Sequence, residues 1–230
     1  MDRRAVVEGI SASWRFLSDC GLAESFASPD PLSVEPDFRD LIISSDSTHE
    51  SLYSFCLQRS YFNILLFDHA FLQFSWSRED HTRFAYYPNP HVSDVTALNK
   101  FRKYRAMLAE GALTDDDFGQ LVRGMAFRGT IPIFRYENAP SQHVPLNHPC
   151  SHMHIGLHSE NRWAVRRQLT PLAFTMLLVK HYYPGEWGLG VPSGSLDGCN
   201  EFEQRLSDER NRCRIVAEFS ELEEKAFHIL

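Results

Sequence analysis

Hydrophobic residues recur every three or four positions in several stretches of the chain, which is the spacing of amphipathic helices. In the first stretch one face carries Val6, Ile10, Trp14 and Leu17. Ser93, Thr114 and Thr170 stand where helix N-caps belong, ahead of three further stretches. The pattern predicts helices over residues 2–20, 93–111, 114–127, 170–184, 201–213 and 220–227.

Other stretches are rich in aromatic and β-branched residues, or alternate between apolar and polar positions, as strands do. Residues 61–77 are apolar on both faces, which predicts a central strand, and Asp68 and His69 can mark a bend in it. The short polar link at 77–81 then predicts a hairpin. Further strands are expected at 82–88, 130–137 and 150–158, with a short one at 162–168.

This order of elements predicts an α+β fold with one curved, mainly antiparallel sheet of four or five strands and helices packed on one face. We expect a single domain over residues 1–230. Its parts are an N-terminal helix within 1–25, a sheet with two inserted helices within 61–165, and C-terminal helices within 170–230.

One predicted strand, residues 150–158, separates two kinds of side chain, because successive residues of a strand face opposite sides. The apolar side carries Met153, Ile155 and Leu157, and the other side carries His152, His154 and His158. We expect the apolar set to be buried and the histidines to line an open face near Arg135 or Glu137. His69 and His81 are assigned to the hairpin, and His181 to the core.

Composition narrows the functional classes only coarsely. A net charge of −7 argues against a protein that coats nucleic acid, although a local basic cleft is compatible with it. The 5 cysteines form no CxxC pair, and no apolar run is long enough for a signal peptide or a membrane span. We therefore expect a cytoplasmic protein with reduced thiols and no membrane association.

The histidines predict acid–base chemistry, since imidazole titrates near neutral pH and can exchange protons with a phosphodiester. The principal hypothesis is a nuclease directed at RNA that needs no cofactor or metal. Its catalytic residues are His148, His152, His154 and Arg135. Its substrate-binding residues are Arg83, Tyr87, His91, Tyr136 and Arg162.

Two further functions fit the same residues. A metal-dependent enzyme would bind its ion through His148, His152, His154 and Glu137. A non-enzymatic adaptor or immunity subunit would use an exposed surface to bind a protein partner, and its histidines would merely line a solvated sheet face. The oligomeric state is left open by the sequence.

The order of FDHAFLQFSWS, RFAYYPNPH, IPIFRYE, HPCSHMHIG and LTPLAFTMLLVKHYYP resembles the uncharacterised bacterial domain-of-unknown-function family 2290, over roughly residues 10–220. This resemblance implies a prokaryotic origin and supplies no activity. More distantly, the pattern is similar to small toxins of toxin–antitoxin loci that act on RNA. That similarity implies a toxin or antiphage-defence protein with a partner encoded nearby, and functional residues His148, His152, His154 and Arg135.

Overall fold

A seven-stranded antiparallel sheet organises the described part of the chain, and its strands lie side by side in chain order. The computed structural model describes residues 1–77, 81–92, 94–125, 131–157, 161–191 and 199–225. The strands are β1 (Ala23–Phe26), β2 (Ile64–Leu66), β3 (Phe71–Trp76), β4 (Thr82–Tyr87), β5 (Phe134–Asn138), β6 (Ser151–Ile155) and β7 (Trp163–Ala164). The α+β class is confirmed, whereas the expected four or five strands were too few.

The two additional strands have local causes. Residues 61–77 form two strands because the chain reverses at Asp68 and His69, where His69 adopts a left-handed backbone with φ +62°. The backbone N–H of Ala70 donates to Asp68 Oδ1 and closes this turn. The other addition is β1, which follows the N-terminal helix directly and pairs with β2.

The helices begin largely where the caps predict. They are α1 (Arg3–Asp19), α2 (Pro36–Ile43), α3 (His49–Gln58), α4 (Val95–Ala109), α5 (Asp115–Arg123), α6 (Pro171–Tyr182), α7 (Pro184–Trp187), α8 (Glu201–Arg212) and α9 (Glu221–Lys225), with 3-10 turns η1 (Pro140–Gln142) and η2 (Gly188–Gly190). Thr114 and Thr170 cap α5 and α6 as predicted. The cap of α4 is Asp94, while Ser93 lies outside the described residues. None of these helices is long and apolar enough to cross a membrane.

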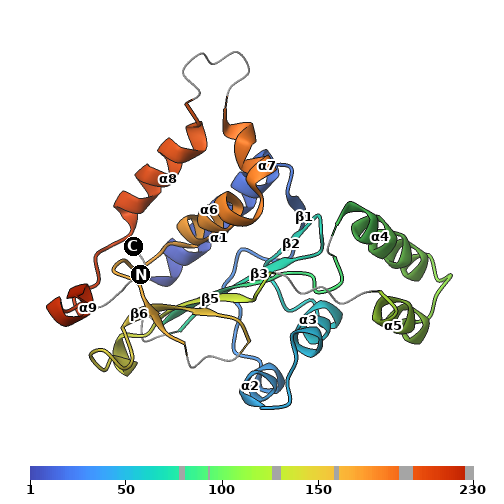
Figure 1. Cartoon of the computed structure of the whole chain (residues 1–230), viewed down its shortest axis with the longest axis horizontal. Coiled ribbons are helices and arrows are strands. Elements are labelled where there is room, and N and C mark those ends of the chain that lie inside the picture. Colours follow the sequence, from blue (N-terminus) through green and yellow to red (C-terminus); the bar gives the residue numbers. More distant parts are fainter. Residues whose placement is uncertain (78–80, 93, 126–130, 158–160, 192–198, 226–230) are drawn as a thin grey trace.

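Helices cover both faces of the sheet, and not one face as expected (Figure 1). On one face α1 and α6 pack against Phe84 and Tyr136, within the larger apolar core. On the opposite face α2 and α3 pack against Phe71, Ala85 and Tyr87. Burial on both sides explains why β2 is apolar at every position rather than alternating.

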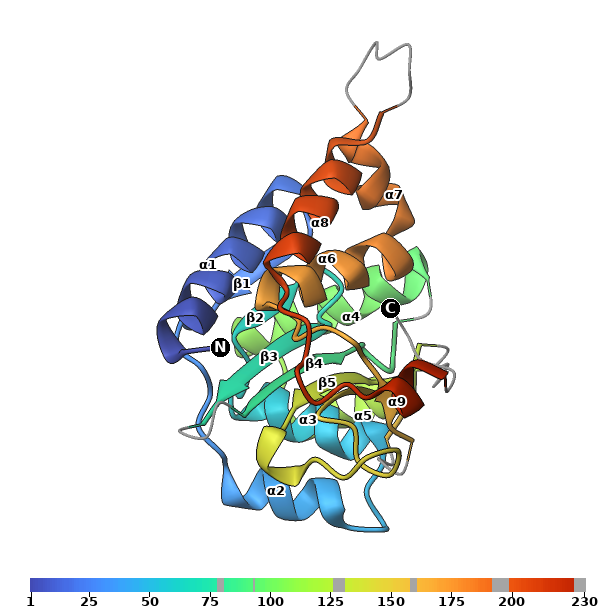
Figure 2. The same cartoon turned by 90° about the vertical axis from the view of Figure 1, so that its left-hand side faces the viewer.

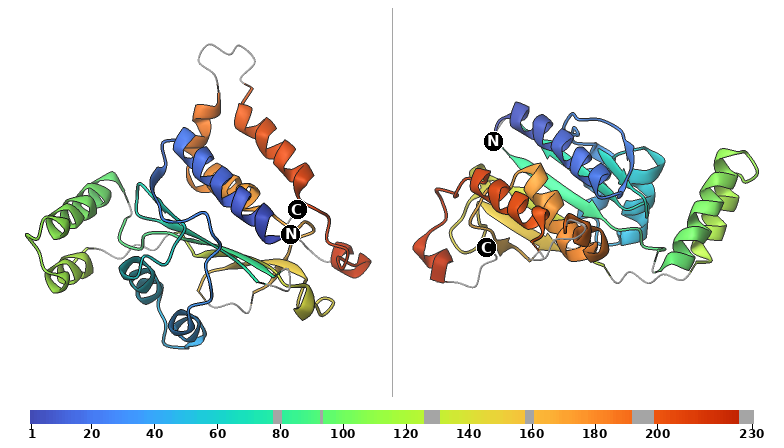
Figure 3. Two further views of the ribbon diagram at one scale, coloured as in Figure 1. Left: turned by 180° about the vertical axis from the view of Figure 1, so that it is seen from behind. Right: turned by 90° about the horizontal axis from the view of Figure 1, so that it is seen from above.

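The second face is only partly covered by helices. Figure 2 shows α2 and α3 beneath the β-sheet, and Figure 3 shows α4 and α5 as a helical pair at the far end of the molecule from α8 and α9. Beyond α2 and α3, the second face carries polar side chains on β4, β5 and β6, and Gln142 and His148 from the segment that links β5 and β6 lie beside them.

Candidate functional site

The strand register brings the predicted residues together on the second face of the sheet. Glu137 of β5 lies between Arg83 of β4 and His152 of β6, and Arg135 pairs with His154 in the next row. Because side chains alternate along a strand, all five point to the same side. Four of the five were predicted as catalytic or substrate-binding residues, and Glu137 as a metal ligand.

Glu137 is the centre of this cluster. Its Oε1 atom lies 2.6 Å from Nε2 of His81. Its Oε2 atom lies 3.7 Å from Nε2 of His152 and 3.6 Å from Nε2 of His154, while these two nitrogens are 3.0 Å apart. Each of Glu137, His152 and His154 thus offers one potential metal-ligand atom, and the three atoms lie within 4.8 Å of one another.

The charge state of the cluster follows from its burial and its partners. Burial alone would raise the pKa of the Glu137 carboxyl, but the neighbouring imidazoles of His154 and His81, with the charge of Arg83, hold that pKa well below its usual range. Burial and the neighbouring His154 lower the pKa of His152 to about 4. At neutral pH the cluster therefore has an ionised carboxylate beside a neutral His152.

Beside the cluster lies a small pocket of about 130 Å³ with a strongly cationic lining. Its walls are Arg83, Arg135, Glu137, Gln142, His148, His154 and Arg162. Several of their buried nitrogens have no hydrogen-bond partner among the described residues: Nε of Arg135 and Arg162, and Nδ1 of His148 and His154. Buried polar atoms of this kind normally have hydrogen-bond partners in proteins. The pocket is therefore suited to an anion that accepts several hydrogen bonds.

The segment between β5 and β6 positions His148 at this pocket. The backbone N–H of Ala139 donates to the carbonyl oxygen of Cys150 and continues the pairing of the two strands beyond their ends. Val144 and His148 then exchange two backbone hydrogen bonds around a tight turn, in which Leu146 has φ +63°. His148 is half-buried, with its ring centroid 4.9 Å from that of His152.

Three of the predicted substrate-binding residues lie elsewhere. Tyr136 points into the opposite core, fully buried, where its hydroxyl meets Ser151 Oγ and accepts from the backbone N–H of Leu169. It alternates with Arg135 and Glu137, so it cannot share their face. The other two are Tyr87 and His91.

Tyr87 is fully buried against Phe71 and Phe38, and it serves the site indirectly by accepting a hydrogen bond of 3.4 Å from Arg83. His91 is only 3% exposed and faces Glu50 in a pocket beside α3 and α5, which shares no residue with the cationic pocket. Neither residue is placed to bind the same substrate as the arginines.

The histidines themselves are more enclosed than predicted. His152 and His154 are 0% and 4% exposed, so they do not line an open face. The apolar set is conversely only half-buried: Met153 packs on the larger core, while Leu157, after a turn at Gly156 with φ +95°, packs on the smaller one. The expected neighbours Arg135 and Glu137 are confirmed.

Two other histidines differ from their assignment. His81 belongs to the site through its contact with Glu137, although the sequence assigned it to the hairpin alone. The contact with Glu137 could have been predicted from the position of His81, which directly precedes β4 and lies opposite the end of β5. His181 is exposed on α6 and not a core residue, and His158 lies outside the described residues.

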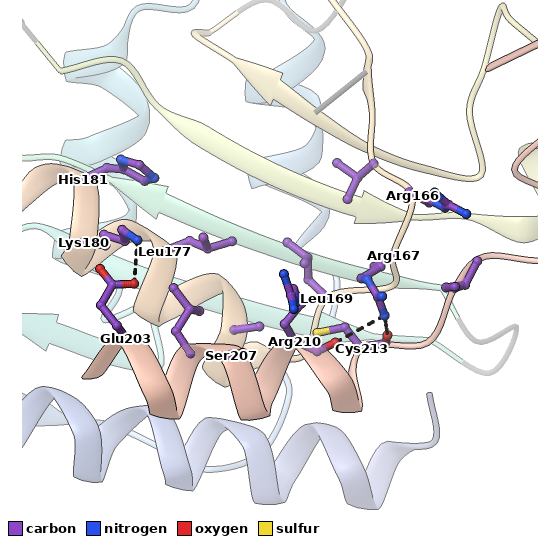
Figure 4. Close-up of a pocket in the computed structure, with 14 residues that line it drawn as sticks. Arg166, Arg167, Leu169, Leu177, Lys180, His181, Glu203, Ser207, Arg210 and Cys213 are labelled. Atoms are coloured by element: carbon purple, nitrogen blue, oxygen red, sulfur yellow. Dashed lines mark hydrogen bonds and ion pairs between the residues drawn. The ribbon is translucent and has the colours of Figure 1, made fainter. Parts of the chain in front are cut away.

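A larger cavity, of about 660 Å³, lies between α6 and α8 (Figure 4). Its floor is apolar, with Leu169 and Leu177, and Lys180 at its rim pairs with Glu203 at 2.7 Å. The Arg167 side chain donates hydrogen bonds to the backbone carbonyl oxygens of Arg210 and Cys213. Among the described residues, none of the buried nitrogens without a partner belongs to the lining of this cavity.

Comparison with protein families supplies a classification. The model of a family described as uncharacterized conserved proteins, DUF2290, matches residues 30–230. The chain belongs to the DUF2290 family. Comparisons with curated proteins and with solved structures return no match. In this DUF2290 protein, the feature that bears on function is therefore the cluster of histidines and arginines on the second face of the sheet.

Proposed function

We propose that this DUF2290 protein is a histidine-dependent phosphodiesterase that cleaves RNA at the cationic pocket. The observation that carries the proposal is the convergence of Arg83, Arg135 and Arg162 on a pocket that also contains the free ring nitrogens of His148 and His154. A role in a toxin or antiphage-defence locus, with a partner encoded nearby, stays a prediction from the sequence.

The arginines account for the substrate class. Guanidinium groups bind phosphate oxygens through paired, charge-assisted hydrogen bonds. The pocket of about 130 Å³ matches a single phosphate group rather than a base, which would remain outside. The same cations would stabilise the additional negative charge that develops on the phosphate oxygens in the transition state.

The imidazoles account for proton transfer. In the proposed reaction one imidazole of the pocket accepts the proton of the RNA 2′-hydroxyl, and the oxygen of this hydroxyl forms a bond to phosphorus. The bond from phosphorus to the 5′-oxygen breaks, and an imidazolium donates its proton to that oxygen. The products are a 2′,3′-cyclic phosphate and a 5′-hydroxyl. His148, half-buried at the pocket, and His154, deeper within it, are the candidate proton carriers.

The test compares cleavage of single-stranded RNA with cleavage of DNA of the same sequence. Replacing His152 and His154 together by alanine should slow RNA cleavage by at least about 100-fold, the loss expected for proton-transfer groups. A matched control is His181→Ala, because His181 is exposed on α6 away from the pocket. Equal rates for the double variant and this control, with both proteins folded by circular dichroism, would contradict the proposal.

A further inference from the structure

We infer that Glu137, His152 and His154 bind one divalent transition-metal ion of the zinc class. Nothing in the proposed phosphodiesterase reaction requires this ion, and the inference rests on the geometry of three ligand atoms and on the groups that orient them. Two imidazoles and one carboxylate form a common ligand set of zinc enzymes.

The spacing of the ligand atoms fits a single ion. Nε2 of His152, Nε2 of His154 and Oε2 of Glu137 form a triangle with sides of 3.0, 3.6 and 3.7 Å. From these side lengths, the point equidistant from all three atoms lies about 2.0 Å from each, and zinc binds such atoms at about 2.0–2.2 Å. Moving the ion out of the plane, as tetrahedral coordination requires, keeps its distances close to that range.

The contacts around the triangle orient it for a metal. Nδ1 of His152 lies 2.7 Å from the carbonyl oxygen of Pro149, so this nitrogen carries the proton and Nε2 presents its lone pair. Metal-binding histidines usually make such a hydrogen bond with their second nitrogen. His81 engages Oε1 of Glu137, which leaves Oε2 directed at the two imidazoles. The two carboxylate oxygens are thus divided between an orienting partner and the proposed ion.

Direct hydrogen bonding explains the cluster less well. Oε2 of Glu137 lies 3.6 Å or more from both Nε2 atoms, which is longer than an ordinary N–H···O hydrogen bond. His152, with its proton on Nδ1, can accept a hydrogen bond from Nε2 of His154 at 3.0 Å, but that bond leaves Oε2 of Glu137 without a donor from either imidazole. A cation at the centre satisfies the carboxylate oxygen and both nitrogens at once.

The ion would also refine the proposed reaction, and this second step rests on the proposed function. Glu137 and His154 line the cationic pocket, so an ion bound to them adjoins the proposed phosphate position. His154 would then be a ligand, and His148 would be the proton carrier. A 2′-hydroxyl on or near the ion would lose its proton more readily, because a bound divalent cation stabilises the oxyanion.

Metal content measured without RNA tests the inference separately from the proposed function. Untagged protein is stripped with a chelator, reloaded with zinc, dialysed and analysed by mass spectrometry. Wild type and His148→Gln should each retain about one ion per chain, whereas His154→Gln and Glu137→Gln should each retain at least about tenfold less. Cobalt loading should give the visible absorption of a tetrahedral site in the first two proteins only.

Wild-type protein without bound zinc or cobalt would overturn the inference, as would full retention by folded His154→Gln and Glu137→Gln. RNA cleavage that persists in metal-free protein would support the phosphodiesterase proposal and show that the reaction does not use the ion. A stoichiometric ion in a protein that cleaves no RNA would support the metal site and contradict the proposed function.

Discussion

The two sides of strands β4, β5 and β6 differ in composition although they share one backbone. On one side Phe84 and Tyr136 pack with their ring centroids 5.5 Å apart, and Phe174 of α6 covers them. On the other side Glu137 is half-buried, and its neighbours are the imidazoles of His81, His152 and His154. The first side gains free energy from apolar burial, whereas the second keeps polar groups dehydrated, at a cost to stability.

The hydrogen bonding of single residues also differs between the two sides. Tyr136 has its hydroxyl satisfied by two partners, so this residue offers no free group to a ligand. On the polar side, Arg135 and Arg162 retain unsatisfied nitrogens. Substitutions on the two sides should therefore separate stability from activity.

After the loss of cleavage expected when the catalytic groups are removed, the next largest effect is on the pH dependence of stability. It comes from a buried histidine outside the polar side. His69, 5% exposed, accepts from Arg105, and burial followed by the charges of Arg105 and Arg102 lowers its pKa to about 4. The unfolded value is near 6.5, so the unfolded chain binds more protons between these two pH values. The free energy of unfolding should therefore fall as the pH drops from 6.5 to 4, by up to about 3 kcal/mol from this residue.

His69→Asn tests this dependence, because asparagine tolerates the left-handed backbone at this position and does not titrate. Urea unfolding at pH 7 and pH 5 should show a smaller pH effect for the variant than for wild type or for His181→Asn. RNA cleavage at pH 7 should be unchanged. An unaltered pH effect would show that the buried His69 does not make stability depend on pH. Lost RNA cleavage would show that His69 affects activity as the histidines of the polar side do.

A smaller effect is expected from Arg162→Ala on the polar side. The Nε atom of Arg162 has no partner among the described residues, so its removal should leave the melting temperature nearly unchanged. Loss of one charge-assisted contact to phosphate should raise KM for RNA about tenfold. Arg166→Ala is the matched control, since Arg166 pairs with Glu224 outside this pocket. An unchanged KM would remove Arg162 from the binding site.

The sequence predicts the strand-borne part of this site well, because alternation and neighbouring strand order place Arg135 near His154. The same alternation rule also excludes Tyr136, once it is applied to residues 135–137. Burial of the histidines could not be predicted, since it depends on how residues 139–150 fold back over β5 and β6. The role of His81 depends on the register between β4 and β5, which composition does not determine.

The most direct test of the account compares two adjacent residues of β5 that face opposite sides. Arg135→Gln should reduce RNA cleavage at least about 100-fold while the protein stays folded, because the transition state loses one of the cations that stabilise its charge. Tyr136→Phe should lower the free energy of unfolding by about 1–3 kcal/mol, because the Leu169 N–H loses its acceptor, and should leave cleavage within about twofold of wild type. Undiminished cleavage by Arg135→Gln, or lost cleavage by a folded Tyr136→Phe, would contradict the assignment of function to the polar side.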